Sequence, residues 1–176
     1  MSVGVMRKLR SFLPVSTLFT LYNALILPHL DYCSLVWSGT SLANLHRLYV
    51  LQKKAIRICS SADRLDSTAP LFKKLNSLTL SDSVSVKLGL FVYKYFNATL
   101  PNIFDNCIVL NQKLHQIETR NKNNIVIPFC RLSITQRNSI IYKSAKFWNS
   151  LDSTLKNVTT QSAFKSRCKR HFISAY

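Results

Sequence analysis

The sequence predicts a mainly α-helical protein. Its 176 residues include only three glycines and five prolines, so long helices meet few breakers. Apolar residues recur with helical spacing between residues 42 and 59, and again in a stripe close to the C-terminus. We expect a helical bundle at residues 1–60 and a helical segment at 61–110. A small α+β part at 111–176 then contains a loop, short β segments and a C-terminal basic helix.

Residues 42–59 carry the strongest helical pattern of the chain. On a wheel at about 100° per residue the segment has a basic arc with His46, Arg47, Lys53, Lys54 and Arg57. The opposite arc is apolar, and Gln52 is the polar residue within it. The apolar arc consists of Leu42, Leu45, Leu48, Tyr49, Leu51, Ala55, Ile56, Ile58 and Cys59. We expect this arc to organise a small core, while the basic arc meets either water alone or a polyanion.

The N-terminal part combines a basic patch at residues 6–10 with a stretch, 11–30, that has no Lys, Arg, Asp or Glu. Such a stretch has two alternative interpretations, a signal sequence and a membrane span. Its hydroxyl and amide side chains would be costly in lipid. We therefore favour an amphipathic helix that begins near Pro14 and is kinked or ended by Pro28.

The remaining helices are expected where cap residues precede apolar runs. Thr40 or Ser41 caps the 42–59 helix, and Thr159 or Thr160 caps the last helix, which runs to about Ile173. That last helix has an apolar stripe made of Phe164, Cys168 and Phe172. The other expected helices span 69–75, about 81–97 and 144–151.

Residues 111–142 do not follow a helical pattern. Residues 111–124 are polar without strong periodicity, which predicts an exposed loop. Ile125–Ile127 and Arg131–Tyr142 are β-prone, and we expect a β-hairpin or two short paired segments there.

The charge of the chain points to a polyanionic partner. Lys and Arg number 24 and Asp and Glu only 7, which gives a net charge of +17. Such a surface attracts phosphate, so nucleic acid is the first expected partner and an anionic membrane surface the second.

Catalytic chemistry is poorly supplied by these residues. Asp63 and Asp66 are the only near pair of acids, and we interpret them as turn or cap residues rather than metal ligands. The sequence has no Gly-rich phosphate loop, no GxSxG and no HExxH. Cys–His nucleophilic catalysis stays open, although no spacing places a histidine beside a cysteine. We expect no catalytic residue, no metal site and no cofactor.

The five cysteines are widely spaced and odd in number, which disfavours a disulfide framework and a zinc site. Reduced, mostly buried thiols in an intracellular protein, nuclear or cytoplasmic, are the better interpretation.

Basic residues recur along the whole chain, and several of them on one face would form a groove for a phosphate backbone. The candidate nucleic-acid-binding residues are Arg47, Lys53, Lys54, Arg57, Lys165, Arg167, Lys169 and Arg170. Exposed aromatic residues would stack on bases, and the alternative is that they belong to the core. The aromatic candidates are Tyr49, Phe129, Tyr142, Phe147 and Trp148.

A series of strings resembles the C-terminal part of the reverse transcriptase of non-LTR retrotransposons of the jockey and CR1 type. In chain order the strings are LYNALILPHLDYCSLVW (21–37), LHRLYVLQKKAIRIC (45–59), APLFKKLNSLTLSD (69–82), LPNIFDN (100–106), His115 with ETR (118–120), SIIYKSAKFWNSL (139–151) and FKSRCKRHF (164–172). Their order covers nearly the whole chain.

The resemblance implies that residues 1–60 are similar to the helical thumb that follows the polymerase palm, and the rest to the post-thumb region. In that family the thumb holds the template–primer duplex. It also implies that the apolar arc of 42–59 packs on the 18–26 helix while Lys53, Lys54 and Arg57 face the duplex backbone.

The chain also departs from the family. Fingers, palm and endonuclease are absent from the sequence, and it has no adjacent pair of aspartates. Where the family often has YNTR, this chain has residues 117–120, IETR. We therefore expect a chain without polymerase activity of its own, a truncated copy or a fragment that begins at an internal Met1.

Three interpretations follow from the sequence. The first is a non-catalytic retrotransposon polymerase fragment that binds RNA–DNA or DNA duplexes without sequence specificity, alone or with the rest of a reverse transcriptase. The second is an inert folded remnant. The third is a membrane-associated basic protein that uses residues 11–30, which we expect less.

Overall fold

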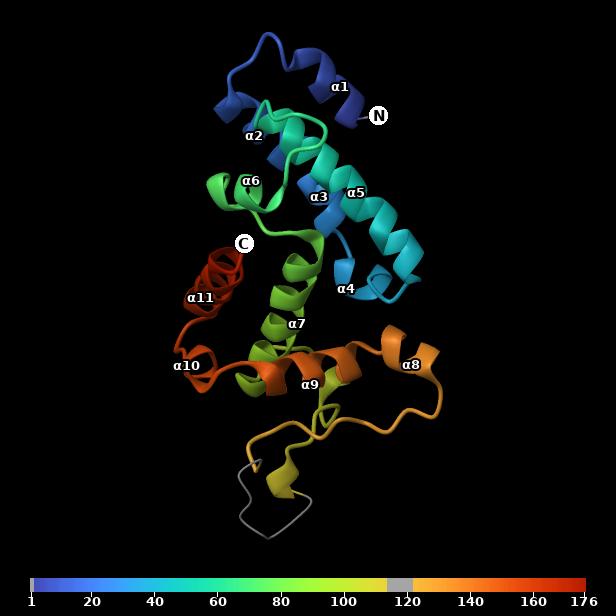
Figure 1. The fold of residues 1–176 in the computed structure, drawn as a ribbon. Helices are drawn as coiled ribbons and strands as arrows, with labels where there is room; N and C mark the ends of the chain where they lie inside the picture. The colour runs from blue at the N-terminus through green and yellow to red at the C-terminus, as the bar shows by residue number, and fades with distance from the viewer. Residues whose placement is uncertain (1, 114–121) are drawn as a thin grey trace. The chain divides into compact units, whose positions relative to one another are not determined.

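The computed structural model describes residues 2–113 and 122–176. Within these residues the protein is mainly α-helical, as predicted (Figure 1). Contacts divide the chain into two compact units. The first contains residues 1–34, 40–83 and 170–176, and the second contains 35–39 and 84–169. The three-segment division expected from the sequence stays a prediction.

Most helices belong to one unit, and three of them cross a unit boundary in the sequence. The first unit contains α1 (Ser2–Leu9), α2 (Val15–Leu25), α3 (Leu27–Asp31), α5 (Leu42–Cys59) and α6 (Ala69–Lys74). The second contains η1 (Asn102–Phe104), η2 (Asn111–Lys113), α8 (Ser133–Asn138), α9 (Ile140–Ser150) and α10 (Ser153–Lys156). The boundary-crossing helices are α4 (Ser34–Trp37), α7 (Leu80–Phe96) and α11 (Gln161–Ser174).

Helix α5 has the bounds that the sequence predicts. Ser41 caps its N-terminus, since the Ser41 hydroxyl accepts a hydrogen bond from the backbone N–H of Asn44. It packs against α1 and against α2, which agrees with the expected contact between segments 42–59 and 18–26 (Figure 1). The apolar arc is only partly buried, because Leu42 at its start is 70% exposed. The buried part of the arc is Ala55, Ile56, Ile58 and Cys59.

Gln52, the polar residue of the apolar arc, is buried at 1% exposure and fully hydrogen-bonded. Its Nε2 donates to the Tyr22 hydroxyl (3.0 Å) and to the Leu78 carbonyl (3.1 Å). Its Oε1 accepts the backbone N–H of Leu80 at 2.8 Å. One side chain thus joins α5 to α2 and to the segment that leads into α7, and burial without these partners would be costly.

Three helices end in the same way without glycine. Ser61, Asn76 and Ala98 follow α5, α6 and α7 with φ of 52°, 49° and 51°. In each case two backbone N–H groups return to carbonyls of the last turn, which is the Schellman motif. The bonds are Ser61 to Ile58 and Ala62 to Arg57, Asn76 to Lys73 and Ser77 to Phe72, and Ala98 to Tyr95 and Thr99 to Lys94.

The C-terminal Tyr176 is anchored in the first unit. Its ring packs edge-on against Phe72, its hydroxyl accepts the backbone N–H of Thr79 (3.0 Å), and that hydroxyl donates to Asp82. Burial, with a smaller effect from the hydrogen bond to Asp82, raises the pKa of Tyr176 to about 12.

The core of the second unit is an aromatic cluster. The Phe164 ring stacks on Tyr93 and on Trp148, with centroid distances of 5.1 and 5.8 Å. Gly89 in α7 permits this approach, since a Cβ there would lie 2.9 Å from Phe147 and 3.1 Å from Phe164. Phe164 and Cys168 of the predicted stripe are fully buried.

The β-hairpin expected near residues 125–142 is not confirmed, and for 131–142 the expectation is wrong. Residues 133–138 and 140–150 form α8 and α9 instead. The helix expected over 144–151 begins earlier, at Ile140, because the Ser139 hydroxyl accepts the backbone N–H of Tyr142 and caps the start of α9. Ile125 does pair with a neighbouring segment, but as an isolated antiparallel bridge with Leu110.

Part of the predicted 111–124 loop lies outside the described residues, and so do His115 and residues 118–120 of the resemblance.

Candidate phosphate-binding groove

A groove of about 560 Å³ lies in the first unit, between α1, α5 and the connection that follows α5. Its lining residues are Val3, Gly4, Arg7, Arg10, Val50, Leu51, Lys53, Lys54, Arg57, Ile58, Ala62 and Arg64. The packing of the helices explains why these lining residues lie together. The contact between α1 and α5 brings two basic segments together, and the Schellman turn at Ser61 directs the connection back along α5.

Among the described residues, the groove is lined by six cations and by no carboxylate. Lys53, Lys54 and Arg57 come from α5, where their spacing puts them on neighbouring positions of one side. The other three cations are Arg7 in α1, Arg10 directly after it and Arg64 in the connection. Six positive charges around one hollow attract an anion that has several negative groups more strongly than they attract an anion with one negative group.

Two of these arginines also hold the walls of the groove in place. Arg10 donates from one terminal nitrogen to the Ala62 carbonyl (3.3 Å), and the Arg57 Nε donates to the Asp66 carbonyl (2.9 Å). A guanidinium has five N–H donors, so each arginine keeps further donors for a ligand. The Lys53 ammonium lies 4.2 Å from the Tyr49 ring centroid, which orients its side chain by a cation–π contact.

Asp63 and Asp66 act as turn residues, as predicted. The Asp66 carboxylate accepts the backbone N–H of Asp63 at 2.8 Å, which closes the connection between α5 and α6 on itself. Neither residue lines the groove.

Three of the eight predicted binding residues line this groove. Lys53, Lys54 and Arg57 line the groove, whereas Arg47 is exposed on α5 without lining it. The four basic residues of α11 do not line it either. In that helix Lys165, Arg167 and Arg170 are exposed and Lys169 is half-buried. Burial, and secondarily the charge of Lys165, lowers the pKa of Lys169.

Arg7, Arg10 and Arg64 are groove residues that sequence reasoning missed. The basic patch at 6–10 was a visible signal, but no periodicity tied it to α5. Only the packing of α1 on α5 brings it there.

The aromatic candidates for base stacking separate by burial. Trp148 is 6% exposed and belongs to the core, while Phe129 is 93% exposed. Tyr49, Tyr142 and Phe147 are half-buried. Stacking on Phe129 is therefore sterically open, and stacking on Trp148 is not.

The buried thiols are unsuited to nucleophilic chemistry at neutral pH. Burial raises the pKa of Cys59 to about 12 and that of Cys168 to about 11, so both stay protonated. Cys33 is exposed.

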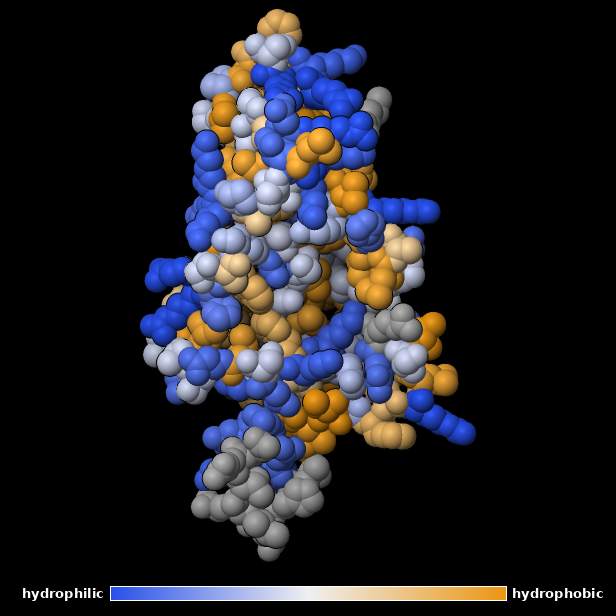
Figure 2. All heavy atoms as spheres, viewed as in Figure 1, coloured by the Kyte–Doolittle hydropathy of each residue, from blue (hydrophilic) through white to orange (hydrophobic). Residues whose placement is uncertain are grey.

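Apolar side chains also reach the surface, and Figure 2 shows them dispersed among hydrophilic ones on one face. Leu65, Phe12 and Ile103 are 93%, 80% and 85% exposed. Among the described residues, no helix combines the length and the apolar character needed to span a bilayer.

A comparison of the chain with protein-family models, with curated proteins and with solved structures finds no match.

Proposed function

We propose that the chain binds the phosphate backbone of nucleic-acid duplexes, RNA–DNA or DNA, without sequence specificity. The groove between α1 and α5 carries this proposal, because it gathers six cations and no carboxylate among its described lining residues. Backbone phosphates space negative charge regularly along a strand, which is the ligand that such a row of cations fits.

The resemblance of the sequence to the thumb and post-thumb region of non-LTR retrotransposon reverse transcriptases supports the same proposal. In this scheme the chain is a non-catalytic part of an RNA-directed DNA polymerase that works in the nucleus or cytoplasm. Lys53, Lys54 and Arg57 would position a duplex for an active site supplied by other polymerase domains.

The test is the salt dependence of binding. Fluorescence anisotropy with a labelled 20-base-pair RNA–DNA hybrid of mixed sequence measures affinity between 50 and 200 mM KCl. If all six cations of the groove contact phosphates, affinity falls about 10³-fold over this range. A mixed-sequence DNA duplex of the same length should behave alike, because backbone contacts carry no base readout.

A triple variant, Lys53→Gln, Lys54→Gln and Arg57→Gln, isolates the groove. With three phosphate contacts left, the slope of log affinity against log salt concentration should fall by about half. The affinity should then decrease roughly 40-fold over the same range of KCl. The matched control, Lys74→Gln, Lys94→Gln and Arg131→Gln, removes the same charge from residues that do not line the groove. Its slope should stay within about one unit of the wild type.

Three outcomes would contradict the proposal. Absence of duplex binding would favour the inert remnant, and flotation of the chain with anionic liposomes but not with neutral ones would favour a membrane surface as the partner. Equal slopes for the two triple variants would show that binding depends on overall charge and not on the groove.

A further inference from the structure

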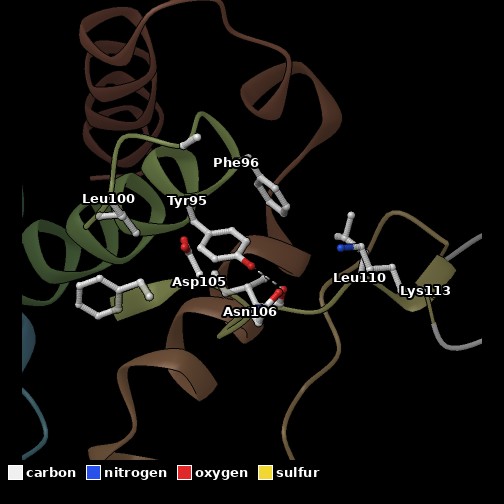
Figure 3. Close-up of a pocket in the computed structure, with 10 residues that line it drawn as sticks. Tyr95, Phe96, Leu100, Asp105, Asn106, Leu110 and Lys113 are labelled. Carbon is white, nitrogen blue, oxygen red and sulfur yellow. Dashed lines mark hydrogen bonds between the residues drawn. The ribbon is translucent and has the colours of Figure 1, made fainter. Parts of the chain in front are cut away.

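A second hollow, of about 440 Å³, lies in the second unit where α7 ends (Figure 3). Tyr95 and Phe96 come from the last turn of α7, and Phe104 from η1. Asp105 and Asn106 follow η1 directly. Leu110 and Lys113 close another side, where the Leu110–Ile125 bridge and the hydrogen bond from the Asn111 N–H to the Asn124 carbonyl hold the chain. The volume is in the range of small-ligand sites.

The aromatic residues of this hollow are held in place, and Phe96 keeps part of its ring exposed. The rings of Tyr95 and Phe96 are nearly perpendicular, at 77°, and the Tyr95 hydroxyl donates to the Ile108 carbonyl (3.0 Å). Phe96 packs on Trp148 with a centroid distance of 5.6 Å and is still 41% exposed. An exposed ring with a supported position is a stacking platform for a planar ligand.

Opposite charges stand on separate sides of the hollow. In Figure 3 Tyr95 lies between Asp105 on one side and Lys113 on the other. A carboxylate accepts two neighbouring N–H groups at once, and a lysine ammonium binds phosphate as a point charge. The Asn106 side chain adds an amide donor and acceptor next to Asp105.

Two classes of ligand could bind in a hollow that combines aromatic rings with a carboxylate. A quaternary or methylated amine would use cation–π contacts, but it would meet Lys113 and a chain of net charge +17. A nucleotide is favoured by the same two features, Lys113 and the positive net charge, because they attract its phosphate. Its base can stack on Phe96. Among bases, guanine presents two adjacent N–H donors, N1–H and N2–H, to a carboxylate.

We propose that this hollow binds an unpaired guanine nucleotide of single-stranded nucleic acid. The base stacks on Phe96, the Asp105 carboxylate accepts from guanine N1–H and N2–H, and Lys113 pairs with the phosphate. This single-strand site goes beyond the duplex groove, and it does not depend on that groove.

Calorimetric titration of the full chain with mononucleotides at 150 mM KCl tests this assignment. GMP should bind at least about fivefold more tightly than AMP, the low end of what a bidentate base contact discriminates. Inosine monophosphate, which lacks the N2 amine, should lie between them. Inorganic phosphate at the same concentration should bind more weakly than GMP.

Variants separate the roles of the two charged residues. Asp105→Asn should abolish the preference for GMP over AMP, while the matched Asp63→Asn in the α5–α6 connection should leave it unchanged. Lys113→Gln should reduce the advantage of GMP over guanosine. The groove triple variant should bind GMP within about twofold of the wild type, so the two proposals fail separately.

Equal affinity for GMP and AMP, no nucleotide binding at all, or an unchanged preference in Asp105→Asn would each overturn the assignment. Displacement of GMP by tetramethylammonium at equal concentration would overturn it in favour of an amine site.

Discussion

Gln52 shows how a single polar residue can be essential within an apolar surface. Its amide satisfies the Tyr22 hydroxyl, the Leu78 carbonyl and the Leu80 N–H, and all four groups are buried or partly buried. Such a network stabilises the fold only while every member is paired, because a lone buried donor or acceptor costs about 1–3 kcal/mol.

We expect Gln52→Leu to lower the free energy of unfolding by about 2–4 kcal/mol. The leucine keeps most of the side-chain volume, so the loss reports the partners left without hydrogen bonds. Urea unfolding followed by circular dichroism measures it.

Gln161→Leu is the control for that substitution, since Gln161 is exposed at the start of α11. Its effect should stay within about 0.5 kcal/mol. A loss of less than 0.5 kcal/mol for Gln52→Leu would mean that the network is replaced by water or is energetically neutral.

At the scale of elements, the helix ends reflect a chain that is poor in glycine. Helices α5, α6 and α7 all close with Schellman motifs whose left-handed residue is Ser61, Asn76 or Ala98. Glycine is the usual residue there because it has no Cβ, and asparagine is the best-tolerated substitute. Ala98 is therefore the least suited of the three to its backbone conformation.

Ala98→Gly should stabilise the protein by about 0.5–1 kcal/mol, measured as a rise in the urea midpoint at unchanged slope. Ala24→Gly, within the last turn of α2, provides the opposite control and should destabilise by up to about 1 kcal/mol. If both substitutions destabilise, the left-handed conformation of Ala98 carries no cost.

The limits of sequence reasoning are also visible in the elements. Both bounds of α5 were predictable, because Ser41 caps its start and the apolar arc stops at Cys59. The 144–150 part of α9 was expected to be helical, but its β-branched start, Ile140 and Ile141, suits a strand locally and hid the first turn, which continues the helix that carries Ala145 and Trp148. Tertiary contact overrode local propensity there.

Only three of the six basic residues that line the candidate groove were predictable from the sequence, for a related reason. Lys53, Lys54 and Arg57 share one helix, so a single periodicity reveals them. Arg7 and Arg64 reach the same hollow through the packing of α1 and the turn after Ser61, and a sequence pattern does not encode such long-range placement.

For the molecule as a whole, charge is the dominant peculiarity. A net charge of +17 on 176 residues makes the folded chain repel itself, and the groove concentrates six of the positive charges. Added salt screens this repulsion, since the Debye length shrinks to about 10 Å at 0.1 M ionic strength.

The melting temperature should therefore rise as NaCl increases from 20 to 200 mM, measured by differential scanning fluorimetry. A variant with Lys53→Gln and Lys54→Gln keeps the Arg57 hydrogen bond to Asp66 and should melt higher than the wild type at 20 mM NaCl, because it has two fewer clustered charges, and its salt response should be smaller. A melting temperature that is constant or falls with salt would contradict self-repulsion as a factor in stability.

The hydrogen bonds of Gln52 also have a rotational consequence. Successive residues of a helix are about 100° apart, so turning α5 by one position would carry Lys53 to the buried place of Gln52. The bonds to Tyr22, Leu78 and Leu80 hold α5 against such a turn about its own axis. The direction in which Lys53, Lys54 and Arg57 point is thus set from inside the core, by a residue that does not line the groove.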